Sequence, residues 1–170
     1  TTTPPSCLAV KQAVADGVTN FSLLTANKTM PMAYEAMKDS ADAFLYPGHV
    51  DAIMGTSAGE AMLKEGVSGV VAGFTARELL TAFAVILAKF PQGKPFFKNC
   101  YPRVVKAEGS PAAQALIKEV MEPCDSEWRG LGVIPQSGLQ LRPAFAVCDA
   151  RKKYGVPAME GRANPACRCG

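Results

Sequence analysis

His49 and a terminal cysteine pair are the residues of this chain best suited to chemistry. His49 is the only histidine, and it follows Gly48 in a turn just after a predicted strand, where its imidazole would be open to a ligand. A histidine in that place can hold a proton or a hydrogen bond, although a lone histidine is also common as a structural residue. Cys167 and Cys169 form a C-x-C pair around Arg168, and thiols near a cation ionise more easily.

The cysteine pair has two interpretations: a metal or redox role, or a flexible end of the chain. The other four cysteines stand singly, and we expect each to be a small buried apolar residue. They are Cys7, Cys100, Cys124 and Cys148. No spacing of histidine and cysteine in the sequence builds a standard zinc site.

Ser57 lies in a GTSAG stretch that superficially resembles the nucleophile elbow of hydrolases. An elbow needs a strand directly before it, whereas residues 50–54 look like a short helix. His49 would also have to be the only base, so the pattern disfavours a hydrolase. The two common phosphate-binding patterns, G-x-x-x-x-G-K-S/T and G-x-G-x-x-G, are both absent from the sequence.

Composition narrows the class of protein further. The 170 residues are 48% hydrophobic and 19% charged, with a formal net charge of +3, which is typical of a globular chain and gives no support for a nucleic-acid partner. No apolar stretch approaches the roughly 18 residues that a membrane span needs. No secretory signal opens the chain. These features predict a soluble, intracellular protein without a membrane partner.

Helix and strand signals alternate along the chain. Short apolar runs predict strands at residues 21–25, 43–46 and 69–72, with helices between them, and a further strand at residues 131–134. This alternation predicts an α/β fold, in which a parallel sheet carries flanking helices and an extended C-terminal tail follows.

The expected organisation is one α/β lobe over residues 1–154, with a division into 1–95 and 96–154 as an alternative. Residues 155–170 are rich in glycine, proline and polar residues, and they are expected to form a linker and tail.

In parallel sheets, ligands gather at the carboxyl ends of the strands. Asn27 and Lys28 follow the first predicted strand, Gly48 and His49 follow the second, and Thr75 comes shortly after the third. If the strands are parallel, these residues share one rim.

The strongest helix signal begins at Thr75, which forms a T-x-x-E capping box with Glu78. Apolar residues then recur at helical spacing until Pro91 ends the pattern. They are Leu79, Leu80, Phe83, Ile86, Leu87 and Phe90. We expect this stripe to pack in the core and not to form a binding face.

Several motifs, in one order along the chain, resemble the HypD family of hydrogenase maturation proteins. Residues 46–50 (YPGHV) are similar to the family's F-L-x-P-G-H-V stretch, and residues 70–74 (VVAGF) match its V-V-A-G-F. Residues 122–132 (EPCDSEWRGLG) resemble E-P-C-D-x-x-W-R-G-L-G, and residues 134–139 (IPQSGL) match I-P-x-S-G-L.

Further agreement lies between and outside these stretches. The family's N-x-Y-x-R-x-V motif is matched by Asn99, Tyr101, Arg103 and Val105. Residues 1–5 look like the end of its G-F-E-T-T-x-P segment, and residues 167–170 are similar to the C-x-C-G that opens its iron–sulfur tail. Ser57 and Ala58 stand where family members usually carry Arg-Pro, so the charge near His49 differs from the family pattern.

The resemblance implies that the chain is an internal to C-terminal part of a cytoplasmic scaffold, on which the Fe(CN)2CO unit of nickel–iron hydrogenase is assembled. It implies a HypC-like chaperone as partner and HypE- and HypF-type proteins as cyanide donors. In the family, iron and a 4Fe–4S cluster take part. The family's C-x-x-C pair and most cluster ligands have no counterpart in this sequence, so we expect the cofactor to be incomplete or absent here.

The residues expected at the binding rim are Thr1, Thr2, Thr3, Gly48, His49 and Thr75. His49 would hold a hydrogen bond or a proton, and the N-terminal threonines would offer hydroxyls near bound cyanide. Cys167 and Cys169 would supply part of the metal ligation. The chain alone is not expected to be an enzyme. Two alternatives remain open: a non-catalytic protein-interaction domain, or a small-molecule enzyme that uses the strand-end rim.

Overall fold

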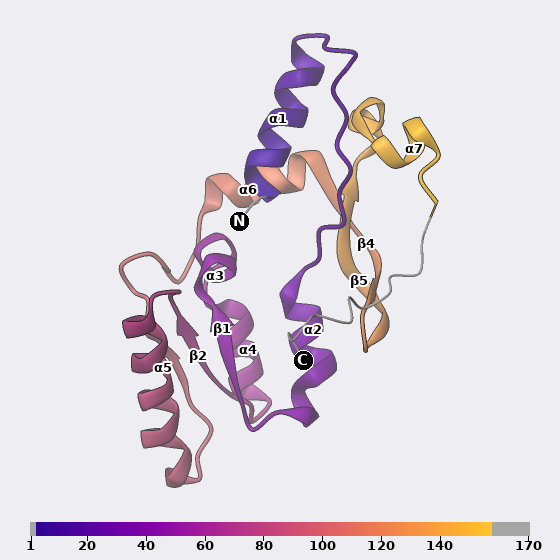
Figure 1. The fold of residues 1–170 in the computed structure, drawn as a ribbon. Coiled ribbons are helices and arrows are strands. Elements are labelled where there is room, and N and C mark those ends of the chain that lie inside the picture. The colour runs from indigo at the N-terminus through magenta and orange to yellow at the C-terminus, as the bar shows by residue number, and fades with distance from the viewer. Residues whose placement is uncertain (1–2, 158–170) are drawn as a thin grey trace.

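The computed structural model describes residues 3–157, which form a small parallel sheet with its helices and, beside it, an antiparallel hairpin packed on further helices (Figure 1). The strands are β1 (Ala43–Pro47), β2 (Ser68–Ala72), β3 (Phe97–Asn99), β4 (Met121–Trp128) and β5 (Gly132–Leu141). The helices are α1 (Thr3–Ala15), α2 (Met30–Met37), η1 (Lys38–Ser40), α3 (Gly48–Met54), α4 (Ser57–Lys64), α5 (Ala76–Lys89), η2 (Phe90–Gln92), α6 (Pro111–Val120), η3 (Pro143–Cys148) and α7 (Ala150–Tyr154), where η marks a 3-10 helix. None of these described helices is long and apolar enough to cross a membrane. Most of the predicted C-terminal tail, residues 158–170, lies outside the described residues.

β2 is the central strand of the parallel sheet, with β1 on one side and β3 on the other. Its sequence, SGVVA, consists of small and β-branched residues, and all of them are buried, as expected of a parallel strand covered by helices on both faces. Pro47 lies opposite Ala72, so β1 and β2 end at the same level. The predicted α/β fold with a parallel sheet and flanking helices is confirmed.

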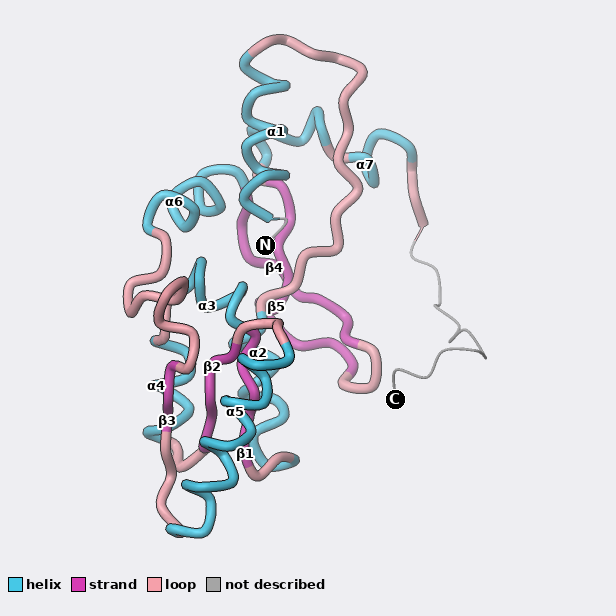
Figure 2. Tube along the Cα trace, turned by 60° about the vertical axis from the view of Figure 1, so that its left-hand side comes forward, coloured by secondary structure: helices cyan, strands magenta, loops and turns pink. Residues whose placement is uncertain are grey.

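Helices cover both faces of this sheet, and α5 lies in front of the strands in Figure 2. On that face, Ala82 of α5 packs with Val70, Ala72 and Phe96. On the other face, α2, α3 and α4 pack around a second cluster. Its buried residues are Tyr34, Tyr46, Met62, Val71 and Val105.

One predicted strand is wrong, and another segment takes its place in the sheet. Residues 21–25 do not join the sheet, because the backbone of Leu23 bonds to Cys148 and Ala150 and forms a single bridge with Asp149. The third strand is instead β3, which pairs with β2. β3 is too short for its sequence to show a strand period.

The hairpin of β4 and β5 organises a separate hydrophobic core with α1 and α6. The two strands are antiparallel, with one irregularity in register between Cys124 and Ser126. The buried residues of this core are Cys7, Val10, Ala13, Val120, Met121, Leu141 and Cys148. The strand predicted at residues 131–134 is confirmed as part of β5. The sequence does not predict β4, since Pro123 and several charged residues hide its period.

The apolar stripe of α5 does not pack in the core as predicted. Leu79 and Ile86 do contact the sheet cluster. The other four residues are 47–73% exposed: Leu80, Phe83, Leu87 and Phe90. α5 turns the small Ala82 toward a sheet of few strands, which leaves the adjoining apolar face of the helix uncovered. A groove of about 440 Å³ lies between this face and the edge strand β1.

The capping box at the start of α5 is confirmed. The Glu78 backbone N–H donates to Thr75 Oγ1 at 3.3 Å, and the Thr75 backbone N–H donates to Glu78 Oε2 at 3.0 Å. The two residues therefore satisfy donors that the first turn of the helix would otherwise leave unpaired.

A cluster of polar side chains is buried between α2, α3 and β1. Asp51 is 3% exposed, and Tyr34 and Tyr46 are 3% and 1% exposed. Asp51 Oδ2 and both phenol oxygens have no hydrogen-bond partner among the described residues. Burial raises the pKa of Asp51 to about 7. Burial also raises the pKa of both tyrosines, and the nearby Asp51 raises each of them further. The folded chain therefore favours the protonated acid at position 51.

Replacing Asp51 by Asn should remove a pH dependence from the stability of the fold. In the unfolded chain the carboxyl ionises near pH 4, but in the folded chain it stays protonated up to about pH 7. Over this range the folded chain binds the extra proton, so the free energy of unfolding should fall as pH rises, by roughly 2–4 kcal/mol. Urea unfolding from about pH 4 to pH 8 should show the fall in the wild type and not in Asp51→Asn. An exposed control, Asp39→Asn, should behave as the wild type; equal slopes in all three chains would contradict the buried acid.

Removing the cap of α5 should destabilise the chain without changing its fold. Thr75→Ala loses the oxygen that accepts from the Glu78 N–H, which should cost about 1 kcal/mol of unfolding free energy. Thr75→Ser keeps that oxygen and should cost much less. The comparison needs urea unfolding followed by circular dichroism, and the cap would be unimportant if both variants matched the wild type.

Candidate functional site

The carboxyl ends of the three parallel strands form one rim, from which the candidate site is built. β1 ends at Pro47, so Gly48 and His49 open α3 at this edge of the sheet. β2 ends opposite Pro47, and Thr75 follows three residues later. β3 ends at Asn99, whose side chain accepts from the Tyr101 backbone N–H at 2.9 Å and fixes the turn that leaves the sheet.

His49 and Phe74 meet across this rim. Their ring centroids lie 4.7 Å apart, with the planes tilted by 32°. Phe74 is 56% exposed, so this ring pair lies at the surface of the rim. Burial lowers the pKa of His49, which makes the neutral imidazole the main form at neutral pH. Neutral imidazole offers one N–H donor and one nitrogen acceptor.

Two glycines at the rim allow neighbouring groups to pack directly against the backbone. A Cβ at Gly48 would lie 2.5 Å from the Ala72 carbonyl oxygen and 2.6 Å from the Tyr101 ring. A Cβ at Gly73 would lie 2.3 Å from Glu78 Oε2 and 2.7 Å from the same ring. The Tyr101 ring therefore lies against both glycines, in space that larger residues would fill.

An ion pair continues the rim beyond Tyr101. Arg103 Nη2 donates to Glu78 Oε1 at 2.7 Å, and the guanidinium carbon lies 4.8 Å from the centroid of the Tyr101 ring. The hydrogen bond from Arg103, together with those from the Thr75 backbone and hydroxyl, lowers the pKa of Glu78 to about 2. Glu78 therefore remains ionised at any physiological pH, while Arg103 keeps a cation at the outer edge of the site.

The structure brings three of the predicted rim residues together. Gly48, His49 and Thr75 lie at the shared carboxyl edge. Thr3 is the first residue of α1, in the part of the chain that packs around the hairpin. Four predicted site residues lie outside the described residues, so their placement stays a prediction. They are Thr1, Thr2, Cys167 and Cys169.

The predicted contribution of Asn27 and Lys28 to the rim is wrong. Lys28 Nζ donates to Ser126 Oγ at 3.1 Å, and the Asn27 side-chain amide donates to Met121 Sδ at 3.7 Å. Both residues therefore lie against the β4–β5 hairpin. The error follows from the strand predicted at residues 21–25, because this segment does not belong to the parallel sheet.

Three rim residues were not assigned a role from the sequence: Glu78, Tyr101 and Arg103. Their signals were present, because Glu78 completes the capping box and the other two stand in the N-x-Y-x-R pattern. What the sequence does not show is that β3 ends at the same edge as β1 and β2, and this places Tyr101 beside Gly48.

The described residues do not supply the thiolate set that an iron–sulfur cluster needs. Cys7 and Cys148 are buried in the hydrophobic core around the hairpin, where they act as small apolar residues. Cys100 and Cys124 lie partly buried on different parts of the chain. Among residues 3–157, no three His, Cys, Asp or Glu side chains come close enough together to hold a metal ion.

Comparison with known proteins gives the family. The model of the HypD family, described as the hydrogenase formation hypA family, matches residues 1–170. The chain is 37% identical to the hydrogenase maturation factor HypD of Rhodobacter capsulatus, over all of this chain and 48% of the relative. It is 34% identical to the hydrogenase expression/formation protein HupD of Azotobacter chroococcum mcd 1, over 99% of this chain and 48% of the relative.

A third relative agrees with these two. The hydrogenase maturation factor HypD of Escherichia coli (strain K12) is 34% identical, over all of this chain and 47% of the relative. The chain thus spans about half the length of the curated relatives it matches. Since the family model covers every residue of the sequence, the chain belongs to the HypD family.

Proposed function

We propose that the chain acts in hydrogenase maturation, as one wall of a HypD-type scaffold on which the Fe(CN)2CO unit of nickel–iron hydrogenase is assembled. The names of its relatives, which are hydrogenase maturation factors, support the general role. The meeting of His49, Phe74 and Tyr101 at one carboxyl edge supports the specific site.

The chemistry of this rim suits an iron–cyanide–carbonyl unit as cargo. A cyanide nitrogen accepts hydrogen bonds, and the neutral imidazole of His49 carries an N–H that can donate one. The Tyr101 ring and the Glu78 carboxylate fill the space beside Gly48 and Gly73, so a compact ligand would meet His49 and Phe74 at the outer surface of the rim. Arg103 is paired with the ionised Glu78, so it adds little net charge, but its remaining N–H groups can donate hydrogen bonds to a cargo at the edge of the rim. In this proposal His49 holds a hydrogen bond or a proton and is not an iron ligand.

Partners and cofactors belong to the same proposal. A HypC-like chaperone would share the iron unit, and HypE- and HypF-type proteins would deliver cyanide. A 4Fe–4S cluster would serve the complete family protein, with Cys167 and Cys169 as part of its ligation. The cytoplasm is the expected location. All of these rest on the family resemblance of the chain.

One observation favours a second function, the docking of a partner protein without chemistry. Leu80, Phe83, Leu87 and Phe90 expose a continuous apolar face of α5 and η2. Contiguous apolar surface of this kind is typical of contact sites. Iron analysis of the full-length protein that contains this chain separates the two functions, because a protein that only docks a partner would carry substoichiometric iron.

The role of the rim predicts a loss of maturation when the imidazole is removed. In the full-length protein that contains this chain, His49→Ala should lower hydrogenase maturation in cells by about tenfold or more, because one donor toward the cargo is lost. The protein should still fold, since His49 lies at the surface of the rim. Hydrogenase activity of a deletion strain carrying each variant measures this, with protein level and circular dichroism as controls.

His49→Gln serves as the matched variant, because glutamine keeps a donor and loses the titratable nitrogen. Recovery by Gln would assign His49 to hydrogen bonding, and failure of Gln but normal folding would assign it to proton handling. Normal maturation with His49→Ala would remove the rim from the function altogether.

The chain alone should not assemble a complete 4Fe–4S cluster. Cys167 and Cys169 are the only thiols outside the described residues, and the four described cysteines are dispersed. Anaerobic reconstitution with ferrous iron and sulfide should therefore leave the chain without the visible absorption of such a cluster. A full complement of iron and sulfide on the purified chain would contradict this expectation.

A further inference from the structure

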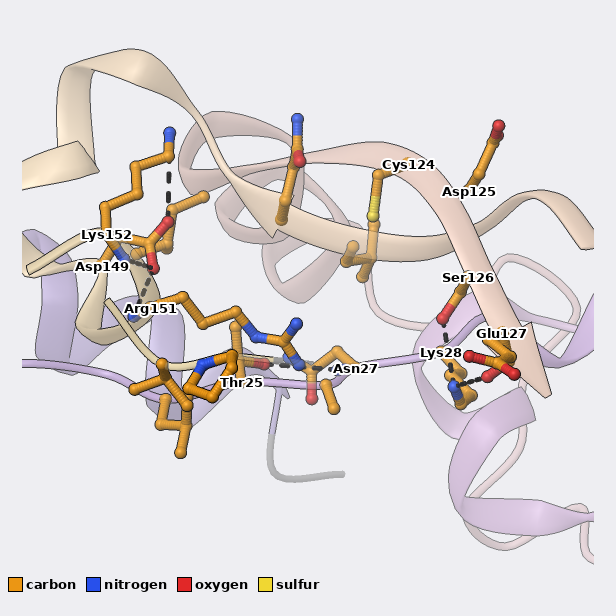
Figure 3. A pocket seen from close by; sticks show the side chains of 17 residues that line it. Thr25, Asn27, Lys28, Cys124, Asp125, Ser126, Glu127, Asp149, Arg151 and Lys152 are labelled. Carbon is orange, nitrogen blue, oxygen red and sulfur yellow. Dashed lines mark hydrogen bonds and ion pairs between the residues drawn. The ribbon is translucent and has the colours of Figure 1, made fainter. Parts of the chain in front are cut away.

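A cavity of about 780 Å³ lies beside the hairpin and shares no residue with the rim (Figure 3). Three separate stretches line it: residues 24–28, the β4–β5 hairpin, and the segment from Asp149 to Pro157. A cavity of this size is in the range that binds metabolite-sized ligands.

The charged side chains around the cavity balance in number. The basic residues are Lys28, Arg151 and Lys152, and the acidic ones are Asp125, Glu127 and Asp149. A ligand with several negative charges would therefore meet as many carboxylates as cations. Which charge can bind a ligand therefore depends on which of these side chains already have hydrogen-bond or ion-pair partners.

Two of the three cations are already engaged. Lys28 Nζ donates to Ser126 Oγ at 3.1 Å and also to the carbonyl oxygen of Glu127. Lys152 Nζ lies 4.0 Å from Asp149 Oδ2. Both interactions are drawn as dashed lines at opposite ends of the cavity in Figure 3.

The guanidinium of Arg151 makes no hydrogen bond or ion pair with any residue that the structure describes. Its backbone N–H donates to Asp149 Oδ1 at 2.9 Å, so the base of the side chain is held by the cap of α7. From there the side chain reaches across the cavity toward Asn27 (Figure 3). Arg151 thus lines the cavity with an exposed, forked cation that has no partner among residues 3–157.

The cavity also has a thiol and an apolar wall. The sulfur of Cys124 points from β4 into the cavity (Figure 3). Burial raises the pKa of this thiol and Asp125 raises it further, while Arg151 and Lys28 lower it, so both cations lie within electrostatic reach of the sulfur. Leu24 and Val156 are 60% and 39% exposed and give the cavity apolar surface.

We propose that this cavity binds a small molecule that carries one carboxylate on an apolar body, with the Arg151 guanidinium paired to the carboxylate. A guanidinium fork matches a carboxylate through two parallel hydrogen bonds. The lining carboxylates repel a phosphate dianion more strongly than a ligand with a single negative charge, which favours a carboxylate. The inference does not depend on the role proposed for the rim.

The alkylation rate of Cys124 can report on binding in this cavity. Iodoacetate carries a carboxylate and iodoacetamide does not, while both alkylate thiols by the same reaction. Peptide mapping by mass spectrometry of the native 170-residue chain measures the two rates at Cys124 and, as an internal reference, at Cys100. If Arg151 attracts carboxylates, Arg151→Gln should lower the iodoacetate-to-iodoacetamide rate ratio at Cys124 about fivefold and leave the ratio at Cys100 unchanged. Arg151→Lys should keep part of the preference.

Competition identifies the ligand class. Butyrate should slow alkylation of Cys124 by iodoacetamide in the wild type and not in Arg151→Gln, whereas butyramide and inorganic phosphate should have no effect. The proposal is overturned by a rate ratio at Cys124 that Arg151→Gln leaves unchanged, by equal protection from butyrate and butyramide, or by stronger protection from phosphate. A Cys124 that neither reagent reaches in the native chain would also overturn it, because a closed cavity takes up no ligand.

Discussion

The site at the sheet edge depends on one constraint: β1 and β2 end at the same level, and their next residues are in direct contact. Pro47 pairs with Ala72, and the first residue of α3 then lies so close to the Ala72 carbonyl that only glycine fits there. This contact allows α3 to begin directly on the sheet. It also fixes His49 beside Phe74 and leaves the flat space that the Tyr101 ring fills. A single unsuitable side chain at this point would separate the elements that make the rim.

The rim and the cavity lie on two parts of the chain that have different kinds of sheet. The rim belongs to the parallel sheet, which is covered on both faces and whose central strand is fully buried. The cavity belongs to the hairpin, whose strand β4 alternates partly buried and exposed positions and therefore presents polar side chains on its open face. Contacts between α2 and β5 join the two parts. A ligand at the cavity and cargo at the rim would thus be held by different hydrophobic clusters.

Local signals in the sequence predicted local structure well. The T-x-x-E box at Thr75 and the apolar run of β2 each act over a few residues, and the structure agrees with them. Gly48 and His49 were located correctly because a strand and a glycine turn stand side by side in the sequence. Tyr101 and Arg103 were visible as a motif, but their role depends on β3 ending beside β1 and β2. That pairing joins segments distant in the sequence, and a strand as short as β3 shows no period.

Asn27 and Lys28 were wrongly predicted at the rim because a contact between segments distant in the sequence, which the sequence does not show, carries them elsewhere. Residues 21–25 have the composition of a strand, but Leu23 bonds to a turn at Asp149, far along the chain, and this carries Asn27 and Lys28 to the hairpin. The α5 stripe shows another limit. Periodicity reports that one face of a helix is apolar, and it carries no information on whether the neighbouring sheet is wide enough to cover that face.

Because the apolar face of α5 is exposed, apolar residues kept at these positions in other members of the family would have a different explanation from those kept in a core. At a core position, an apolar residue persists because a polar one would unfold the protein. At Leu80 and Leu87, which are 68% and 73% exposed, a polar residue would cost the fold little and would improve solubility. Apolar residues retained at these two positions across distant species would therefore record selection by another molecule, and the sequences of such species already hold that test.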